Sequence, residues 1–462
     1  VPFVLPTVVV ALAFGALLGE RGIVNRWLMG LLGSETPPIR LENSLTLVVI
    51  AHVFFNFSIV LRLVGGYWAS ADQRLEDAAR VLGASGWRLW REIRLPLIAP
   101  ALLAAALLVF MFSFAAFGTV LLLGGPEMRT VEVEIYDQAI QFNLGSAAAL
   151  SLLQIAATLA LTAVYTRLQR RTAVAQETRE QPGRPLGSWR ARLAAGAIIA
   201  GMLALLGAPL LALAASAFVG PDGWTTRSFE LLWSNQRGSY VYVPPQQALG
   251  NSLLFAALAT LLALACGIPA AYLLARPRGR LGRWLDPLFM LPLGTSAVTL
   301  GFGYIIAFRA QRLALGPLVL ETPDLRASRW LIPLAHALLA LPFVTRTMLP
   351  ALRRLNPRLR EAAATLGAPP GRVLWEIDAP LLLPAVIVSA TFAWTVSLGD
   401  FGAALLLSRP ENATLPVVLY RYLGQPGQTN YGQALAMSTL LMAVTLISFL
   451  VIERLRPEGG EF

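Results

Sequence analysis

Ten runs of predominantly apolar residues dominate the sequence and constrain its fold more than any other feature. They lie near residues 2–19, 44–64, 97–124, 145–167, 191–219, 248–276, 285–308, 330–350, 379–407 and 433–453. A helix needs about 20 such residues to cross the hydrocarbon core of a bilayer. Pro and Gly inside some runs are tolerated in membrane helices. The pattern predicts an all-α polytopic membrane protein with about ten helices in this chain.

Composition supports a membrane protein over a water-soluble enzyme. Apolar residues make up 56% of the chain and charged residues 14%, whereas a soluble domain has about 45–50% and about 25%. All 37 basic residues are Arg, so the P-loop motif, which needs a Lys, is excluded. Neither GxSxG nor HExxH occurs, and we therefore expect no enzymatic activity from this chain.

The Arg residues divide unequally between the two sides of the membrane. With the C-terminus and the loops after residues 64, 167, 276 and 350 inside, the inner side has 23 Arg and the outer side 12. This asymmetry fits the positive-inside rule. The net charge of +11 is therefore attributed to contact with the lipid bilayer, and no nucleic-acid partner is expected.

Two long inner loops repeat the same pattern at a constant offset of 284 residues. Over Asp77–Pro100 and Glu361–Pro384, eleven of 24 positions are identical without a gap. The offset also relates His52 to His336, Phe117-Gly118 to Phe401-Gly402, and Tyr136 to Tyr420. The equivalent spans 97–124 and 379–407 are the third and the ninth of the ten, an even number of places apart, so the two halves have the same orientation and form a parallel repeat.

The repeat divides the chain into a first transmembrane half at 1–175, a cytoplasmic linker at 176–190 and a second transmembrane half at 191–462. Spans 191–219 and 248–276 have no counterparts in the first half. We expect a native protein of about twelve helices, with two more before residue 1. A first half that never had these two helices is the alternative.

Each repeated loop has the features of a short helix, a turn and a second helix. Small Ala and Gly residues allow another surface to approach closely, and an acid near a helix start is favoured by the helix dipole. Pro96 and Pro380 fit the beginning of the next helix. Two such protruding elements would suit a two-fold symmetric partner.

The paired loops resemble the EAA loop of binding-protein-dependent ABC importer permeases. That pattern is an acid, two small residues, Gly after three more, and a later Ile-x-x-Pro; Asp77 replaces the usual Glu, and Ala379 the usual Leu. The resemblance implies two parallel pseudo-repeats of the type I importer transmembrane fold. It assigns ATPase coupling to Asp77, Ala78, Ala79, Gly83, Glu361, Ala362, Ala363 and Gly367.

The same resemblance implies the partners and the location. An ABC ATPase dimer inside would bind ATP and Mg, and an extracytoplasmic solute-binding protein would deliver the solute. This chain would bind no cofactor and would be a multi-pass protein of the cytoplasmic (inner) membrane. Glu127 and Glu411 are candidate contacts for the binding protein, because the repeat places both outside.

With two halves fused in one chain, the sequence resembles the subfamily of importers for thiamine, ferric iron and aminoethylphosphonate, whose permeases have both halves in one chain. Residues 51–56, 112–115 and 397–402 are most similar to thiamine permeases. The substrate expectation is thiamine or a thiamine phosphate, moved inward. Ferric iron and aminoethylphosphonate are alternatives, and a secondary transporter is a more distant one.

Asp400 is an acid well inside an apolar run, and such residues commonly face a cavity or a partner. Asp400 could attract a cationic solute, with cation–π contacts from nearby aromatic rings; alternatively it caps a helix and the rings pack. The candidate pathway residues are Asp400, Phe401, Phe117, Phe114, Trp394 and Ser397. His52 and His336 could form a proton or metal site, but bonds to neighbouring groups are the simpler explanation, and no metal site is predicted.

Overall fold

The computed structural model describes residues 5–69, 73–172, 187–220, 223–235, 242–275, 289, 291–292, 295–315 and 318–454. Most of the expected linker 176–190 lies outside these ranges. Within them, nine helices are long and apolar enough to cross a membrane. The predicted span 285–308 falls partly outside the described residues; its described part contains the 11-residue apolar helix α14 (Ala297–Ala307). The expected all-α polytopic fold is confirmed.

The first half consists of helices joined by short loops. They are α1 (Thr7–Leu18), α2 (Ile23–Leu32), α3 (Leu45–Ala69), α4 (Gln73–Val81), α5 (Gly86–Leu89), a π-helical turn (Trp90–Arg94), α6 (Leu95–Phe114), α7 (Gly118–Leu123), α8 (Val131–Ile140) and α9 (Leu144–Thr172).

The second half repeats most of this order after two additional long helices. It contains α10 (Trp189–Ala217), β1 (Val219–Gly220), β2 (Gly223–Trp224), α11 (Arg227–Glu230), a 3₁₀ turn (Leu231–Trp233), α12 (Pro245–Ala275), α14, β3 (Gln311–Leu315), β4 (Leu318–Thr322), α15 (Leu331–Arg354), α16 (Pro357–Thr365), α17 (Pro370–Val373), a π-helical turn (Leu374–Asp378), α18 (Ala379–Gly399), α19 (Gly402–Leu407), a 3₁₀ turn (Pro410–Asn412), α20 (Leu415–Leu423) and α21 (Gln428–Arg454). The strands form two antiparallel hairpins, β1–β2 and β3–β4. The two additional helices are α10 and α12, and the hairpin β3–β4 lies where the first half has α2.

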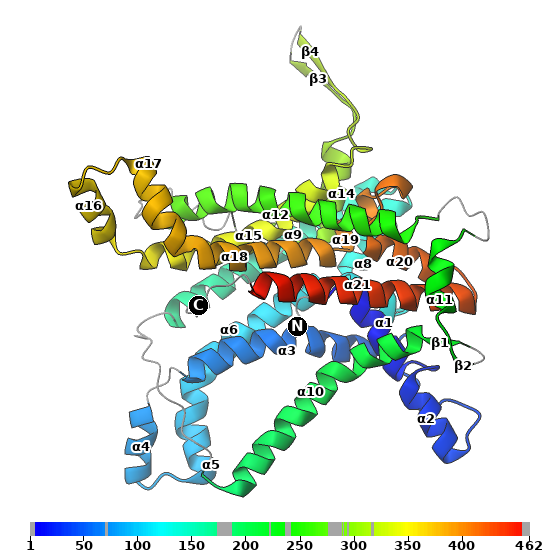
Figure 1. Ribbon diagram of the computed structural model, residues 1–462, viewed down its shortest axis with the longest axis horizontal. Coiled ribbons are helices and arrows are strands. Elements are labelled where there is room, and N and C mark those ends of the chain that lie inside the picture. Colours follow the sequence, from blue (N-terminus) through cyan, green and yellow to red (C-terminus); the bar gives the residue numbers. More distant parts are fainter. Residues whose placement is uncertain are drawn as a thin grey trace.

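The two halves interlock, and helix α1 lies at the centre of their shared core. Val8, Val9 and Val10 are fully buried, and the cluster around them includes side chains of α20 and α21 from the second half. Helix α10 begins the second half in sequence but packs against α1 (Figure 1). The boundary between the halves in sequence is therefore not a boundary in space.

The outer faces of the long helices are apolar and uncovered. Only 17% of the most apolar 18-residue stretch of α10 is buried. Leu203 and Leu211 on this helix are 66% and 72% exposed. A water-soluble monomer rarely exposes apolar surface on this scale. The exposed leucines are therefore suited to contact with lipid tails.

The two repeated loops fold into matching helix–turn–helix elements at one end of the molecule. In Figure 1, α16 and α17 lie at the same end as α4 and α5. Gly83 and Gly367 end α4 and α16 with φ of 88° and 81°, a left-handed conformation that Gly adopts with little strain. In both loops the amide after this Gly, at Ala84 or Ala368, donates to a carbonyl five residues earlier, which satisfies an otherwise unbonded helix end.

Pro96 and Pro380 lie in the first turn of α6 and α18, as expected. The structure adds that the preceding turns join these helices without a break, so that continuous helices run over Gly86–Phe114 and Pro370–Gly399. Proline has no N–H for the carbonyl four residues earlier. In both repeats a π-helical turn lies immediately upstream, at Trp90–Arg94 and Leu374–Asp378. This wider turn lets the helix pass the proline without ending.

Candidate functional site

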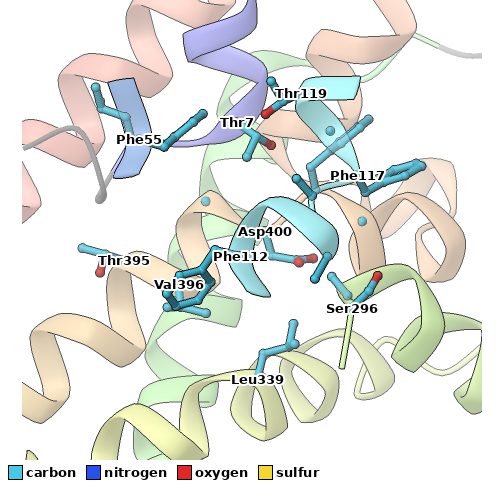
Figure 2. A pocket seen from close by; sticks show the side chains of 18 of the residues that line it. Thr7, Phe55, Phe112, Phe117, Thr119, Ser296, Leu339, Thr395, Val396 and Asp400 are labelled. Atoms are coloured by element: carbon cyan, nitrogen blue, oxygen red, sulfur yellow. The ribbon is translucent and has the colours of Figure 1, made fainter. Parts of the chain in front are cut away.

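A cavity of about 290 Å³ lies between the two halves. Its walls come from α3, the end of α6 and residues 115–119 on one side, and from residues 292–297, α15 and residues 395–402 on the other. Six lining positions of the first half have their repeat equivalents in the opposite wall: 55 with 339, 112 with 396, and 115–118 with 399–402. The cavity therefore lies on the pseudo-two-fold axis (Figure 2).

Aromatic rings and small polar groups share the cavity wall. The rings are those of Phe55, Phe112, Phe117, Phe343 and Phe401; hydroxyl or amide groups come from Thr7, Asn56, Thr119, Thr295, Ser296 and Thr395. Among the described residues that line the cavity, Asp400 has the one carboxylate and no Arg is present. The wall formed by these residues thus has acidic rather than basic character.

Asp400 is held by two donors from neighbouring elements. Its Oδ2 lies 3.0 Å from His336 Nε2 on α15 and accepts a 3.0 Å bond from the Ala404 amide in α19. The other ring nitrogen of His336 is 2.8 Å from Ser397 Oγ. An ionised carboxylate can only accept, so Nε2–H donates to it and, in a neutral ring, Nδ1 accepts from the Ser397 hydroxyl. Asp400 remains 9% exposed and lines the cavity (Figure 2).

The first half does not reproduce this arrangement. His52, the counterpart of His336, lines the cavity, and its buried Nε2 has no hydrogen-bond partner in the described part of the chain. Ala116 stands where the second half has Asp400. The cavity is therefore symmetric in shape but acidic on one wall only. No group of three His, Cys, Asp or Glu suited to a metal ion occurs among the described residues.

Four aromatic side chains join the halves beside the cavity, and we name them the aromatic quartet. Phe117 and Phe401 stack with centroids 5.7 Å apart; Tyr136 lies 5.3 Å from Phe117, and Tyr420 lies 5.2 Å from Phe401. All four positions are related by the repeat offset. The tyrosines come from α8 and α20, which lie away from the end that carries α16 and α17 (Figure 1).

Three of the six predicted pathway residues, Asp400, Phe401 and Phe117, line the cavity, and the other three are absent from its described lining. Phe114 stacks on Phe110, and the buried indole nitrogen of Trp394 has no partner in the described chain. The Ser397 hydroxyl lies 2.8 Å from Nδ1 of His336.

The sequence reasoning did not assign Phe55, Phe112 or Phe343 to the pathway. The sequence could have predicted Phe112 as a lining residue, because its repeat equivalent, Val396, lies four residues before Asp400 in the same apolar run.

A second buried acid connects the halves next to the cavity and was also missed. Glu132 on α8 is fully buried and accepts a hydrogen bond from the Ser296 hydroxyl, which lines the cavity. Helix α8 has ten residues and is not one of the candidate spans. Burial raises the pKa of Glu132 to about 8, so the carboxyl is mostly protonated at neutral pH.

The residues expected to couple to an ATPase lie mostly on the surface. Asp77, Ala78, Gly83, Glu361, Ala362 and Gly367 are exposed, Ala363 is half-buried and Ala79 is buried. Two apolar side chains beside them, Leu82 and its counterpart Leu366, are 85% and 88% exposed. This surface has the small and apolar character that a close protein contact requires.

The two candidate contacts for a binding protein are also exposed. Glu127 lies between α7 and α8, and Glu411 lies between α19 and α20. Asn251 and Gln247 of α12 donate to the Glu411 carbonyl at 3.2 and 3.1 Å. The backbone is therefore fixed at Glu411 while its carboxylate faces outward.

Comparison with known proteins identifies the family. Residues 1–174 and 267–458 match the family of binding-protein-dependent transport system inner membrane components. The chain belongs to this family. The match covers both repeated loops and both walls of the cavity. The chain is therefore a multi-pass permease subunit of an ABC importer in the inner membrane, a transport component rather than an enzyme.

Individual relatives differ in the solute that their names give. The thiamine transport system permease protein ThiP of Escherichia coli (strain K12) is 27% identical over 98% of this chain and 80% of its own length. The molybdenum transport system permease protein ModB of Mycobacterium tuberculosis is 36% identical over 47% of this chain and 81% of its own. A putative 2-aminoethylphosphonate permease, PhnV of Salmonella typhimurium, is 28% identical over 46% and 76%. The expected family is confirmed, and the relatives leave the solute open.

Proposed function

We propose that this permease moves a small solute with a cationic heterocyclic ring, thiamine or a thiamine phosphate, inward across the membrane. ATP hydrolysis on a separate subunit would drive the movement, and an extracytoplasmic binding protein would deliver the solute. The observation that carries the proposal is the aromatic cavity with one acidic wall on the pseudo-two-fold axis. Similarity to thiamine permeases across both halves supports it.

The chemistry of the cavity favours a cation over an anion. Rings such as Phe117 and Phe401 attract a cation over their faces, and Asp400 adds a carboxylate that is poorly screened at this depth. Small-molecule sites start at about 300 Å³, which is comparable to the 290 Å³ found here.

The alternative solutes fit this wall less well. A molybdate or aminoethylphosphonate anion would meet Asp400 without an Arg among the described lining residues. Ferric iron prefers several oxygen or nitrogen ligands, and the described lining offers a single carboxylate. A secondary transporter would leave the two matched, exposed coupling elements unexplained.

The proposed cycle assigns this chain the tasks of gating and coupling. Closure of the ATPase dimer would move the coupling elements α4–α5 and α16–α17 through contacts at Asp77, Ala78, Ala79 and Gly83 and at Glu361, Ala362, Ala363 and Gly367. The halves would then rock about the cavity, accept the solute on the outer side near Glu127 and Glu411, and return. ATP and Mg would remain on the partner subunit.

Replacement of Asp400 tests the proposed solute. Asn keeps a carbonyl oxygen for hydrogen bonding but removes the charge, so Asp400→Asn should lower kcat/KM for thiamine uptake about tenfold, which corresponds to about 1.4 kcal/mol. Assembly with the ATPase should be unchanged. Asp324→Asn, the same change at an exposed loop acid, is the matched control. Uptake kinetics equal to those of the control would contradict the role of Asp400.

A further inference from the structure

Each coupling segment is closed by an ion pair between residues that lie 18 positions apart. Arg94 makes two hydrogen bonds of 2.9 Å to the Glu76 carboxylate. In the second half, Arg360 Nε donates to Asp378 Oδ1 at 2.9 Å. These residues are repeat equivalents, Glu76 with Arg360 and Arg94 with Asp378. The positions of the pair are therefore retained while its polarity is reversed.

Both pairs join the same two parts of the fold. Glu76 and Arg360 lie on the first helix of the loop, one residue before the acid of the repeated motif. Arg94 and Asp378 end the π-helical turns that lead into α6 and α18. Each pair therefore connects the exposed helix of the loop directly to the beginning of a membrane-spanning helix.

Apolar packing contributes little to holding α16 in place, and in α4 the buried apolar side chain is the small Ala79. Of the nine residues of α16, eight are exposed and Ala363 is half-buried. The Asp378 side chain, by contrast, is only 7% exposed and that of Glu76 18%. Partly buried, well-aligned ion pairs are stronger than solvated ones. The angle between each exposed helix and its membrane helix therefore depends largely on the ion pair.

The reversed polarity indicates what the pairs do. A charge read by a partner protein would need the same sign in both halves, if the two halves meet equivalent partner surfaces. The neighbouring pairs Arg88–Glu92 and Arg372–Glu376 are also repeat equivalents and keep their polarity, but they are solvated and lie within one helix. Of these four pairs, the two that connect separate parts of the fold have the acid and the Arg at exchanged positions. This exchange is expected where the ion pair itself, rather than the charge at one position, is required.

We propose that Glu76–Arg94 and Arg360–Asp378 act as two struts that transmit movement between the ATPase-docking helices and the membrane helices. The four side chains are positioning residues, because they act through the orientation of α4 and α16. This inference rests on the coupling role proposed above for the two loops. It adds that coupling requires an intact strut in each half, regardless of which end carries the positive charge.

A charge-reversal series in the full complex tests the struts. The permease, its ATPase and its binding protein are reconstituted, and solute transported per ATP hydrolysed is measured. Arg360→Asp alone places two acids together and should lower this ratio at least about tenfold. Arg360→Asp combined with Asp378→Arg should restore it to at least half of the wild-type value, because the first half already has that polarity. Arg372→Glu, in the solvated pair, should change it less than twofold.

Two further measurements distinguish a role in coupling from a role in folding alone. Complex assembly is followed by size-exclusion chromatography, and Asp378→Glu, which keeps the charge, should retain most of the coupling. A single variant that transports normally would overturn the strut, as would a double variant as defective as the single one. A wild-type complex that forms but hydrolyses ATP independently of solute would overturn the coupling role of the loops and the strut together.

Discussion

Glu132 illustrates at the residue scale how the interface between the halves constrains a titratable group. Its carboxyl is fully buried, and the Ser296 hydroxyl from the other half donates to it. The ordinary pKa of 4.5 is raised to about 8 by this burial. Between these two values the folded protein keeps a proton that the unfolded chain releases. Stability should therefore fall as pH rises through this window and level off above it.

We predict that Glu132→Gln raises thermal stability, and that the gain increases from pH 5 to pH 8. The amide cannot ionise and can still accept the bond from Ser296, so the cost of keeping a carboxyl protonated disappears. Each pKa unit corresponds to about 1.4 kcal/mol. The measurement is the melting temperature of the detergent-solubilised protein, followed by tryptophan fluorescence. A difference between variant and wild type that is the same at both pH values would contradict the assigned pKa.

The sequence predicts the unusual position of Asp400 but not the contacts of Asp400 and Glu132. Asp400 could be identified as an unusual acid because its neighbours in sequence are apolar. Its bond to His336 could not be predicted, since the two residues are 64 positions apart and no periodicity links them. Burial of Glu132 could not be predicted, because it lies in a polar segment between two apolar runs and becomes buried only when the two halves pack together.

At the scale of elements, the aromatic quartet is the contact that joins α7 and α8 of the first half to α19 and α20 of the second. Phe117 and Phe401 precede α7 and α19 and form the stack across the axis. Aromatic pairs at such distances contribute roughly 0.5–1.5 kcal/mol beyond their buried area. Both rings also line the cavity, so their separation would widen it.

We predict that Phe117→Ala combined with Phe401→Ala lets solute leak through the permease without ATP. Removing both rings takes away the stack that holds the halves together beside the cavity. The measurement is thiamine efflux from loaded proteoliposomes in the absence of ATP, which should rise at least about tenfold. The matched control is Phe218→Ala with Phe229→Ala, a stacked pair within the second half. Equal efflux from both double variants would exclude a sealing role for the quartet.

The elements themselves were partly predictable. Apolar runs located the long helices, and the motif Gly located the turn in each coupling loop, because its left-handed conformation is a local requirement. The π-helical turns before Pro96 and Pro380 were not predictable from the usual rule that Pro begins a helix. The carbonyl four residues before a Pro is left unpaired within a helix and can be accommodated by a wider turn. Only the structure shows that this solution is used here.

At the scale of the whole molecule, the repeat predicted two similarly oriented halves, and the structure adds how they meet. The equivalent walls of the cavity face each other across the pseudo-axis, and α10 crosses from the second half onto α1. An offset in sequence establishes equivalence but not contact. The packing of α10 on α1 and the acidic character of one cavity wall are therefore evident only in the folded structure.

In the proposed function, this permease links ATP hydrolysis on a partner subunit to the delivery of a cationic heterocycle. The most direct test is ATPase activity of the permease–ATPase complex in nanodiscs. Binding protein loaded with thiamine is compared with binding protein loaded with ferric iron, and Glu361→Arg, on the exposed face of α16, serves as the uncoupled control.

We predict stimulation by the thiamine-loaded protein, little by the iron-loaded one, and none in Glu361→Arg despite normal folding. Stimulation by iron alone would retain the importer and contradict the solute. Absence of any association with the ATPase, or full transport by Glu361→Arg, would contradict the coupling itself.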